Sequence, residues 1–237
     1  MVGSRRMTAG GDANASQWAK YLGEAGLTIT SGLAIDVDGA AHRGALQGLP
    51  AAGKTIAVMA TGIEQVYPYH HRQLAEQILQ ADGALITEFA PGSKPLPAYF
   101  PQRNLIISGL SLGVLVVEAA VKSGSLINAR LAMEQDREVS ALPGSIHNPQ
   151  SRGCHALIKQ GAQLVETAAD IIHELREPLA GLSDAMPPLP SIQSSPSTKT
   201  RVDLDANEAS LLNELGVEPI ARDGPAITFT QKNLPNY

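Results

Sequence analysis

Short apolar runs alternate with segments of helical periodicity from the start of the chain to about residue 175. The runs are rich in β-branched residues and hold few polar positions, which is typical of strands buried on both faces of a sheet. The clearest are residues 113–119, Gly-Val-Leu-Val-Val-Glu-Ala, and residues 55–60, Thr-Ile-Ala-Val-Met-Ala. Shorter runs predict further strands at residues 28–30, 84–87, 138–142 and 163–165.

Segments with apolar residues three or four positions apart lie between these runs, and Gly or Ser marks most of their boundaries. They predict helices at residues 12–25, 40–46, 70–81, 126–133, 154–160 and 168–175. Alternating strands and helices joined by short turns predict an α/β fold, a doubly wound, mostly parallel Rossmann-like sheet with helices on both faces. Ligands of such sheets bind beyond the carboxyl ends of the strands.

Three segments depart from this alternation. Residues 91–101 contain four prolines, which predict a stiff extended loop. Met1-Val2 supplies only a stub of a first strand that would need about five residues, so we expect the sheet to lack pairing there. The predicted α/β domain covers residues 1–176, a Pro- and Ser-rich linker covers 177–203, and a tail covers 204–237. Since the tail holds one short helical pattern, it is either a fragment of a second domain or flexible and disordered.

Composition narrows the class of protein. The 237 residues include one cysteine, Cys154, which excludes a disulfide framework within the chain and favours a reducing, cytoplasmic location. No stretch holds the roughly 20 apolar residues of a membrane helix. The net charge of −5 argues against general coating of duplex DNA, so a nucleic-acid role would depend on a local basic patch. The spacing of His147, Cys154 and His155 does not match a zinc site, and we expect no metal.

The turn from the predicted strand at 113–119 into the next helix reads Lys122-Ser123-Gly124-Ser125. A helix that opens on Gly and Ser presents backbone N–H groups and a positive dipole end, which suit a phosphate. Upstream, Phe100 offers an aromatic face and Arg103 a fork of donors. Together these features indicate a nucleotide or a single nucleic-acid strand.

Each of these residues also has a purely structural interpretation. Phe100 could be a core anchor, Arg5 and Arg103 could be partners in surface ion pairs, and the Lys122 turn could simply cap a helix. His42 lies among small residues of a predicted helix and is expected to be a structural histidine rather than a catalytic base.

Several motifs together resemble the DNA-processing protein A family (DprA/Smf), over about residues 2–176. They include Gly3-Ser4-Arg5, Ser31-Gly32-Leu33-Ala34, Phe100-Pro101 with Arg103-Asn104, Ser108-Gly109-Leu110-Ser111, Val116-Val117-Glu118-Ala119, Lys122-Ser123-Gly124-Ser125 and Pro143-Gly144-Ser145 with Asn148-Pro149. The resemblance implies a Rossmann-like core that binds and protects single-stranded DNA and helps to load the recombinase RecA in DNA uptake and natural transformation. It implies binding without catalysis and without a cofactor, and a tail that is the remnant of a winged-helix-like domain.

The resemblance also implies where DNA binds. Arg5 corresponds to a phosphate contact, Phe100 to an aromatic residue that meets a base, and Lys122 to the matching Lys-Ser-Gly-Ser turn. The predicted DNA-binding residues are Gly3, Ser4, Arg5, Phe100, Arg103, Asn104, Lys122, Ser123, Gly124 and Ser125. Two departures each remove a positive charge that the family usually carries, at Leu105 and at Ile35-Asp36.

The family resemblance further suggests a homodimer through the C-terminal part of the α/β domain, where we expect Ile158 and Leu164 to meet a second copy. The alternative is that both residues are ordinary core. Two other functional classes remain open. One is an enzyme of the phosphoribohydrolase type on a related fold, which Glu118 and the Gly124 turn suggest weakly, although the Pro-Gly-Gly loop of that class is missing. The other is a pure interaction module.

Overall fold

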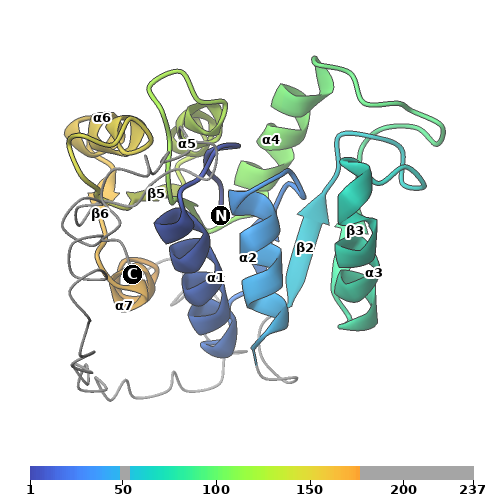
Figure 1. The fold of residues 1–237 in the computed structure, drawn as a ribbon, viewed down its shortest axis with the longest axis horizontal. Helices are drawn as coiled ribbons and strands as arrows, with labels where there is room; N and C mark the ends of the chain where they lie inside the picture. Colours follow the sequence, from blue (N-terminus) through green and yellow to red (C-terminus); the bar gives the residue numbers. More distant parts are fainter. Residues whose placement is uncertain (49–53, 177–237) are drawn as a thin grey trace, which may run out of the picture.

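The computed structural model describes residues 1–48 and 54–176 as an α/β domain with parallel strands between two layers of helices (Figure 1). The predicted linker (177–203) and tail (204–237) lie outside the described residues.

All six predicted strands are present, and they form two parallel sheets of three strands each. One sheet has the order β1 (Ile29–Ser31), β2 (Thr55–Val58), β3 (Ala84–Ile86), and the other has the order β4 (Gly113–Val116), β5 (Glu138–Ala141), β6 (Gln163–Leu164). The register aligns Ile29 with Thr55 in the first sheet and Val114 with Val139 in the second. The carboxyl ends of all six strands therefore point toward the same end of the domain.

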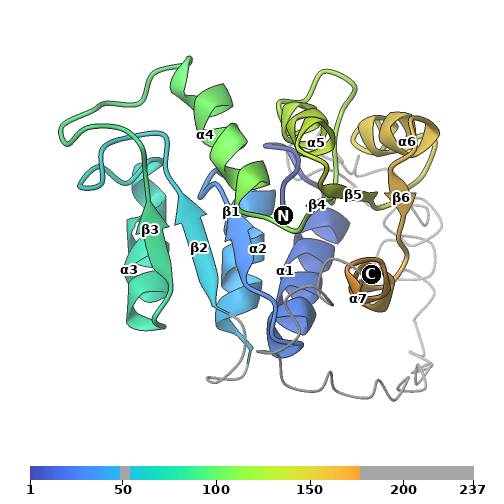
Figure 2. The ribbon, with the colours of Figure 1, turned by 180° about the vertical axis from the view of Figure 1, so that it is seen from behind.

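Val2 joins the two sheets at that end. Its N–H donates to the Leu115 carbonyl at 2.9 Å, its carbonyl accepts from Val117 N–H at 3.1 Å, and Met1 N donates to the Thr30 carbonyl at 2.7 Å. Beyond Val2, β1 and β4 belong to separate sheets and share no hydrogen-bonded ladder (Figure 2). A groove of about 340 Å³ lies between these two strands. The prediction that pairing is missing is therefore confirmed for the groove and wrong at Val2 itself, which forms a parallel bridge with Val116.

Helices cover both faces of the strands, as predicted. The first face carries α1 (Ala9–Glu24), α2 (Val37–Leu46), α3 (Arg72–Gln80) and α7 (Ala168–Glu174); the second carries α4 (Tyr99–Gly109), α5 (Ser125–Glu134) and α6 (Arg152–Lys159) (Figures 1 and 2). A single 3₁₀ turn, η1 (Tyr69–His71), precedes α3. Along β4 and just beyond it, Leu115 and Val117 point into the core under α1 and α2, whereas Val114 and Val116 point into the core under α4 to α6. This alternation explains why the run is apolar at consecutive positions.

Helix α4 was not predicted from the sequence: residues 91–101 were expected to form a loop, and no element was expected between that loop and the strand at 113. The helix starts at Tyr99 and includes Pro101 as its third residue. Proline is tolerated in a first turn because the N–H groups there have no partner within the helix. Ile107, which is 1% exposed, anchors the helix to the core.

Two further features of the described residues bear on function. No helix in residues 1–48 or 54–176 combines the length and apolar character that crossing a membrane requires. The same part of the chain contains no group of three or more His, Cys, Asp or Glu side chains placed to hold a metal ion.

Candidate nucleic-acid interface

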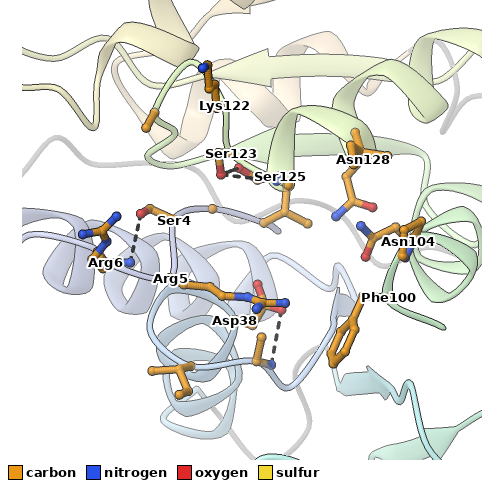
Figure 3. Close-up of a pocket in the computed structure, with 18 of the residues that line it drawn as sticks. Ser4, Arg5, Arg6, Asp38, Phe100, Asn104, Lys122, Ser123, Ser125 and Asn128 are labelled. Atoms are coloured by element: carbon orange, nitrogen blue, oxygen red, sulfur yellow. Dashed lines mark hydrogen bonds between the residues drawn. The ribbon is translucent and has the colours of Figure 1, made fainter. Parts of the chain in front are cut away.

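A cavity of about 640 Å³ opens at the carboxyl ends of the strands (Figure 3). It is bounded by the loop after Val2, the turn before α2, the start of α4 and the turn into α5. Its lining includes all ten predicted site residues: Gly3, Ser4, Arg5, Phe100, Arg103, Asn104, Lys122, Ser123, Gly124 and Ser125. The expected convergence of Arg5, Phe100, Arg103 and Lys122 is therefore confirmed.

The loop that carries Arg5 is held at both sides. A Cβ at Gly3 would lie 2.5 Å from the Val37 side chain, so only glycine allows the loop to approach α2 this closely. Ser4 Oγ donates to Gln150 Oε1 at 2.7 Å and accepts from Arg6 N–H at 2.9 Å. These contacts leave the side chains of Arg5 and Arg6 exposed at the cavity.

Glu118 fixes the other end of the same loop. Its Oε1 accepts from Thr8 Oγ1 at 2.6 Å and its Oε2 from Thr8 N–H at 2.8 Å, while its carbonyl accepts from Ser4 N–H at 2.7 Å. Thr8 in turn caps the N-terminus of α1 through Gly11 N–H. Because Glu118 is 8% exposed and both its carboxylate oxygens are occupied, it acts as an anchor for the Arg5 loop.

Arg5 and Phe100 contact each other across the cavity. The guanidinium carbon of Arg5 lies 5.1 Å from the centre of the Phe100 ring, within the range of a cation–π contact. In Figure 3, Arg5 extends from its loop toward Phe100, which stands on α4. Phe100 is partly exposed, so it is not the buried core anchor that its structural interpretation required.

The turn into α5 holds Lys122 exposed and without an ion-pair partner among the described residues. Ser123 Oγ and Ser125 Oγ lie 2.6 Å apart and share a hydrogen bond. The expectation of free N–H groups here is wrong for the first helical residues, because Ser125 and Leu126 donate back to Ser123 at 3.3 and 3.2 Å. The turn therefore offers a phosphate two hydroxyls, the Lys122 ammonium and the positive end of α5.

Arg103 differs from the other cations because it is only 4% exposed. Its Nη1 lies 3.7 Å from Asp38 Oδ2 and 3.4 Å from the Val58 carbonyl. Burial lowers the pKa of the guanidinium and the Asp38 carboxylate opposes that shift, so Arg103 stays charged. A side chain at Gly32 would overlap the guanidinium, which explains the glycine there. Arg103 thus forms an ion pair, as its structural interpretation proposed, but the pair is buried in the wall of the cavity and not at the surface.

The lining carries an excess of positive charge. Four cations (Arg5, Arg6, Arg103 and Lys122) and one acid (Asp38) give a formal charge of +3, in a chain whose net charge is −5. A local excess of positive charge thus lies where a phosphate backbone would need it.

Several residues of the lining were not predicted from the sequence, chiefly Arg6, Asp38, Asn128 and Gln150. Asn128 is 4% exposed, and its Oδ1 has no hydrogen-bond partner among the described residues. Asn128 could have been predicted from its position in the first turn of α5, directly after the predicted phosphate-binding turn Lys122-Ser123-Gly124-Ser125. No local pattern marks Gln150, which reaches Ser4 from a distant loop.

His42 is structural, as expected, and lies below the cavity floor. The Thr55 hydroxyl donates to the Ile29 carbonyl at 2.7 Å, so His42 Nδ1–H donates to Thr55 Oγ1 at 2.7 Å. Burial, together with nearby positive charges, lowers the pKa of His42 to about 3. The ring is therefore neutral at physiological pH.

Known proteins are similar to this chain in sequence and in fold. The family model of the DNA recombination-mediator protein A matches residues 1–176. Protein Smf of Escherichia coli (strain K12) is 50% identical over 185 residues, 78% of this chain and 49% of that protein. DNA processing protein DprA of Streptococcus pneumoniae is 45% identical over 174 residues, 73% of this chain and 60% of that protein. The chain thus spans about half to three fifths of the length of these relatives.

Solved structures agree. The X-ray structure of DprA from Streptococcus pneumoniae superimposes with a TM-score of 0.66 at 44% identity and covers 73% of this chain and 59% of its own. DNA processing protein A from Helicobacter pylori, described for its single-stranded DNA binding mode, superimposes with a TM-score of 0.66 at 28% identity. The match covers 75% of this chain and 79% of that chain. The family model, the relatives and the shared Rossmann-like fold agree, and this chain belongs to the DNA recombination-mediator protein A (DprA/Smf) family.

Proposed function

We propose that this chain binds and protects single-stranded DNA, with the cavity of Figure 3 as its binding site. The observation that carries the proposal is the convergence in one cavity of a partly exposed aromatic ring, Phe100, with two cations that have no carboxylate partner among the described residues, Arg5 and Lys122. Cations track a phosphate backbone and an aromatic ring stacks on any base, so this combination suits a strand of any sequence.

In this proposal the phosphate lies at Lys122, Ser123 and Ser125, and a base lies against Phe100. Arg5 reaches Phe100 in the free protein and would turn to a phosphate when the base takes its place. Arg103 is buried beside Asp38, so we assign it to supporting the floor of the cavity, with Asn104 and Asn128 presenting amides to the ligand.

The whole protein's role is proposed from its family. We infer that the chain acts in DNA processing during uptake and transformation, in the cytoplasm, and helps to load the recombinase RecA on the strand it protects. The similarity to DprA of Streptococcus pneumoniae and to DNA processing protein A of Helicobacter pylori supports this assignment.

We further propose that the role is binding without catalysis. A phosphoribohydrolase-like enzyme would require a free carboxylate at the nucleotide, whereas both carboxylate oxygens of Glu118 accept hydrogen bonds from Thr8. An assay for base release from nucleoside monophosphates tests this point. No release is expected, and release that Glu118→Gln abolishes would establish the enzyme instead.

Salt-dependent titration tests the binding site. We expect labelled oligo-dT to bind in fluorescence anisotropy, with an affinity that falls as salt rises. Arg5→Ala should weaken binding and reduce the magnitude of the log–log salt slope by about 0.7, the loss of one phosphate contact on a single strand. Phe100→Ala should weaken binding by roughly 1–3 kcal/mol at an unchanged slope, because it removes stacking alone. If neither substitution changes the titration, the site is wrong.

A homodimer through α6 and β6 completes the proposal. Leu164 is 43% exposed on the outer strand of its sheet, and Ile158 of α6 is partly exposed. Ile158→Asp should give a folded monomer in light scattering. An unfolded chain would indicate that Ile158 is core, and an unchanged dimer would refute this interface.

A further inference from the structure

Aromatic residues gather at the ligand end of the domain. The chain has nine Phe, Trp and Tyr residues, and five of them lie within residues 67–100: Tyr67, Tyr69, Phe89, Tyr99 and Phe100. They lie in the segments that follow β2 and β3 and at the start of α4. The proposed site uses Phe100 alone, which leaves four rings close to it in the sequence without a role.

Tyr67 is the ring of these four that contacts Phe100. The two ring centres are 6.0 Å apart, edge to face at 62°. Tyr67 is 50% exposed, so a large part of its surface is open to solvent. It belongs to the loop that follows β2, whereas Phe100 belongs to α4, and the two elements thus bring their rings together at the cavity rim.

A second, smaller cavity of about 50 Å³ lies beside these two rings. It shares Arg5, Ala34, Ile35, Phe100 and Arg103 with the main cavity, so the two are continuous around Phe100. Tyr67 and Pro68 form its outer side. Its remaining lining residues are Gly32 and Ala60. The surface next to Phe100, on the side of Tyr67, is therefore concave, mostly apolar and edged by an aromatic ring.

The two rings are close enough to meet neighbouring nucleotides of one strand. Their centres are 6.0 Å apart and their planes are inclined at 62°, so two bases would meet them in different orientations. A hollow of 50 Å³ is too small to enclose a base, so a base would lie on the exposed ring of Tyr67 and over the hollow.

The other three rings fit this role less well. Phe89 and Tyr99 stack on each other at 4.0 Å and 19°, so each covers a face of the other. Tyr69 is the most exposed, at 76%, but it lines neither cavity. Tyr69 is therefore a matched control for Tyr67, two residues away in the same loop region.

We propose that Tyr67 is a second stacking position of the site and binds the base next to the one on Phe100. This assignment rests on the proposed function and adds the path of the strand. The backbone runs from the Lys122 turn past Arg5, crosses Phe100 and continues over the loop after β2. The expected ligand is an extended single strand. At least two of its nucleotides stack on aromatic rings, in addition to the one whose phosphate lies at Lys122, Ser123 and Ser125.

The test compares Tyr67→Ala, Tyr67→Phe and Tyr69→Ala with the unchanged chain, in anisotropy titrations against oligo-dT of decreasing length. Tyr67→Ala should weaken binding of long oligonucleotides about 5- to 100-fold, the effect of one lost stacked base, at an unchanged salt slope. Tyr67→Phe keeps the ring and should bind within about twofold of the unchanged chain, and Tyr69→Ala should bind as the unchanged chain does. The effect of Tyr67→Ala should vanish for oligonucleotides too short to extend beyond Phe100.

Three outcomes would overturn the assignment. If Tyr67→Ala binds every length as the unchanged chain does while Arg5→Ala still weakens binding, the second position fails and the proposed function stands. If Tyr69→Ala weakens binding as much as Tyr67→Ala, the effect belongs to the loop and not to a specific ring. If the unchanged chain does not bind oligo-dT at all, both the proposed function and the second position fail. Circular dichroism of each variant confirms that it is folded.

Discussion

Glu118 and Arg5 belong to different segments of the chain, but the hydrogen bonds of Glu118 determine the position of the loop that carries Arg5. Glu118 holds Thr8 through two hydrogen bonds of 2.6 and 2.8 Å and Ser4 through its backbone carbonyl, so the loop with Arg5 between them has little freedom. Glu118 is thus a positioning residue for the proposed site, and its influence on DNA should pass through Arg5.

A double-mutant cycle tests this coupling. Glu118→Gln has one acceptor where Thr8 presents two donors, which should cost about 1–3 kcal/mol of folding stability and weaken oligo-dT binding. If Glu118 acts through Arg5, its effect on binding should largely disappear in an Arg5→Ala background, whereas it should add to that of Lys122→Ala, since the effects of residues that share no partner add. Full additivity with Arg5→Ala would refute the positioning role.

His42 should make the domain sensitive to acid. Its folded pKa of about 3 lies below the ordinary value of 6.5, so the unfolded chain binds the proton first and the free energy of unfolding falls as pH drops below 6.5. The loss approaches about 1.4 kcal/mol per pH unit from this residue.

Denaturant titrations between pH 6.5 and 5 should therefore show a shallower loss of stability for His42→Asn, which can still donate to Thr55 but does not titrate. Some slope should remain, because burial also lowers the pKa of His71. A slope unchanged by the substitution would show that the buried ring of His42 is not the source.

At the scale of elements, the strands were predictable because buried parallel strands are continuous apolar runs, and β4 is the clearest case. Helix α4 was not predictable, because the four prolines in residues 91–101 indicate a loop. Only the packing of Ile107 against the core reveals the helix. The ten predicted residues line one cavity because turns at strand ends, which carry distinctive Gly, Ser and basic residues, meet at one end of the domain. Gln150 and the proposed stacking residue Tyr67 were not predicted, because Gln150 reaches Ser4 and Tyr67 reaches Phe100 through tertiary contacts that no local pattern encodes.

The groove between β1 and β4 predicts a gain in stability from an added strand. By the alternation of parallel ladders, Thr28 and Thr30 on one side and Gly113 and Leu115 on the other direct backbone groups into it, and the Thr30 and Leu115 carbonyls already accept from Met1 N and Val2 N–H. Each remaining group that is buried and unpaired costs on the order of 1–3 kcal/mol.

Five apolar β-branched residues joined ahead of Met1 should therefore raise the melting temperature by several degrees, at about 2–4 °C per kcal/mol for a chain of this size. A Gly-Ser extension of equal length is the control, because it adds chain without a strand-forming pattern. Equal melting temperatures for the two extensions would show that the groove does not accept a strand.

At the scale of the whole molecule, charge is unevenly distributed. Residues 1–48 and 54–176 hold 14 Lys and Arg against 15 Asp and Glu, a formal charge of −1, whereas the lining of the cavity carries +3, so a strand would be attracted to this end of the domain. This distribution fits a protein that holds a strand at one place better than one that coats duplex DNA along its length.

Photocrosslinking locates the bound strand most directly. Oligo-dT with one 5-iodouracil, bound to the full chain and irradiated, attaches to aromatic side chains that stack on the modified base, and mass spectrometry of peptides identifies the attachment site. The account predicts attachment at Phe100, lost in Phe100→Ala, with Tyr67 modified when the iodouracil is moved by one nucleotide. Attachment confined to residues outside the cavity, for example on α7 or β6, with Phe100 unmodified, would contradict it.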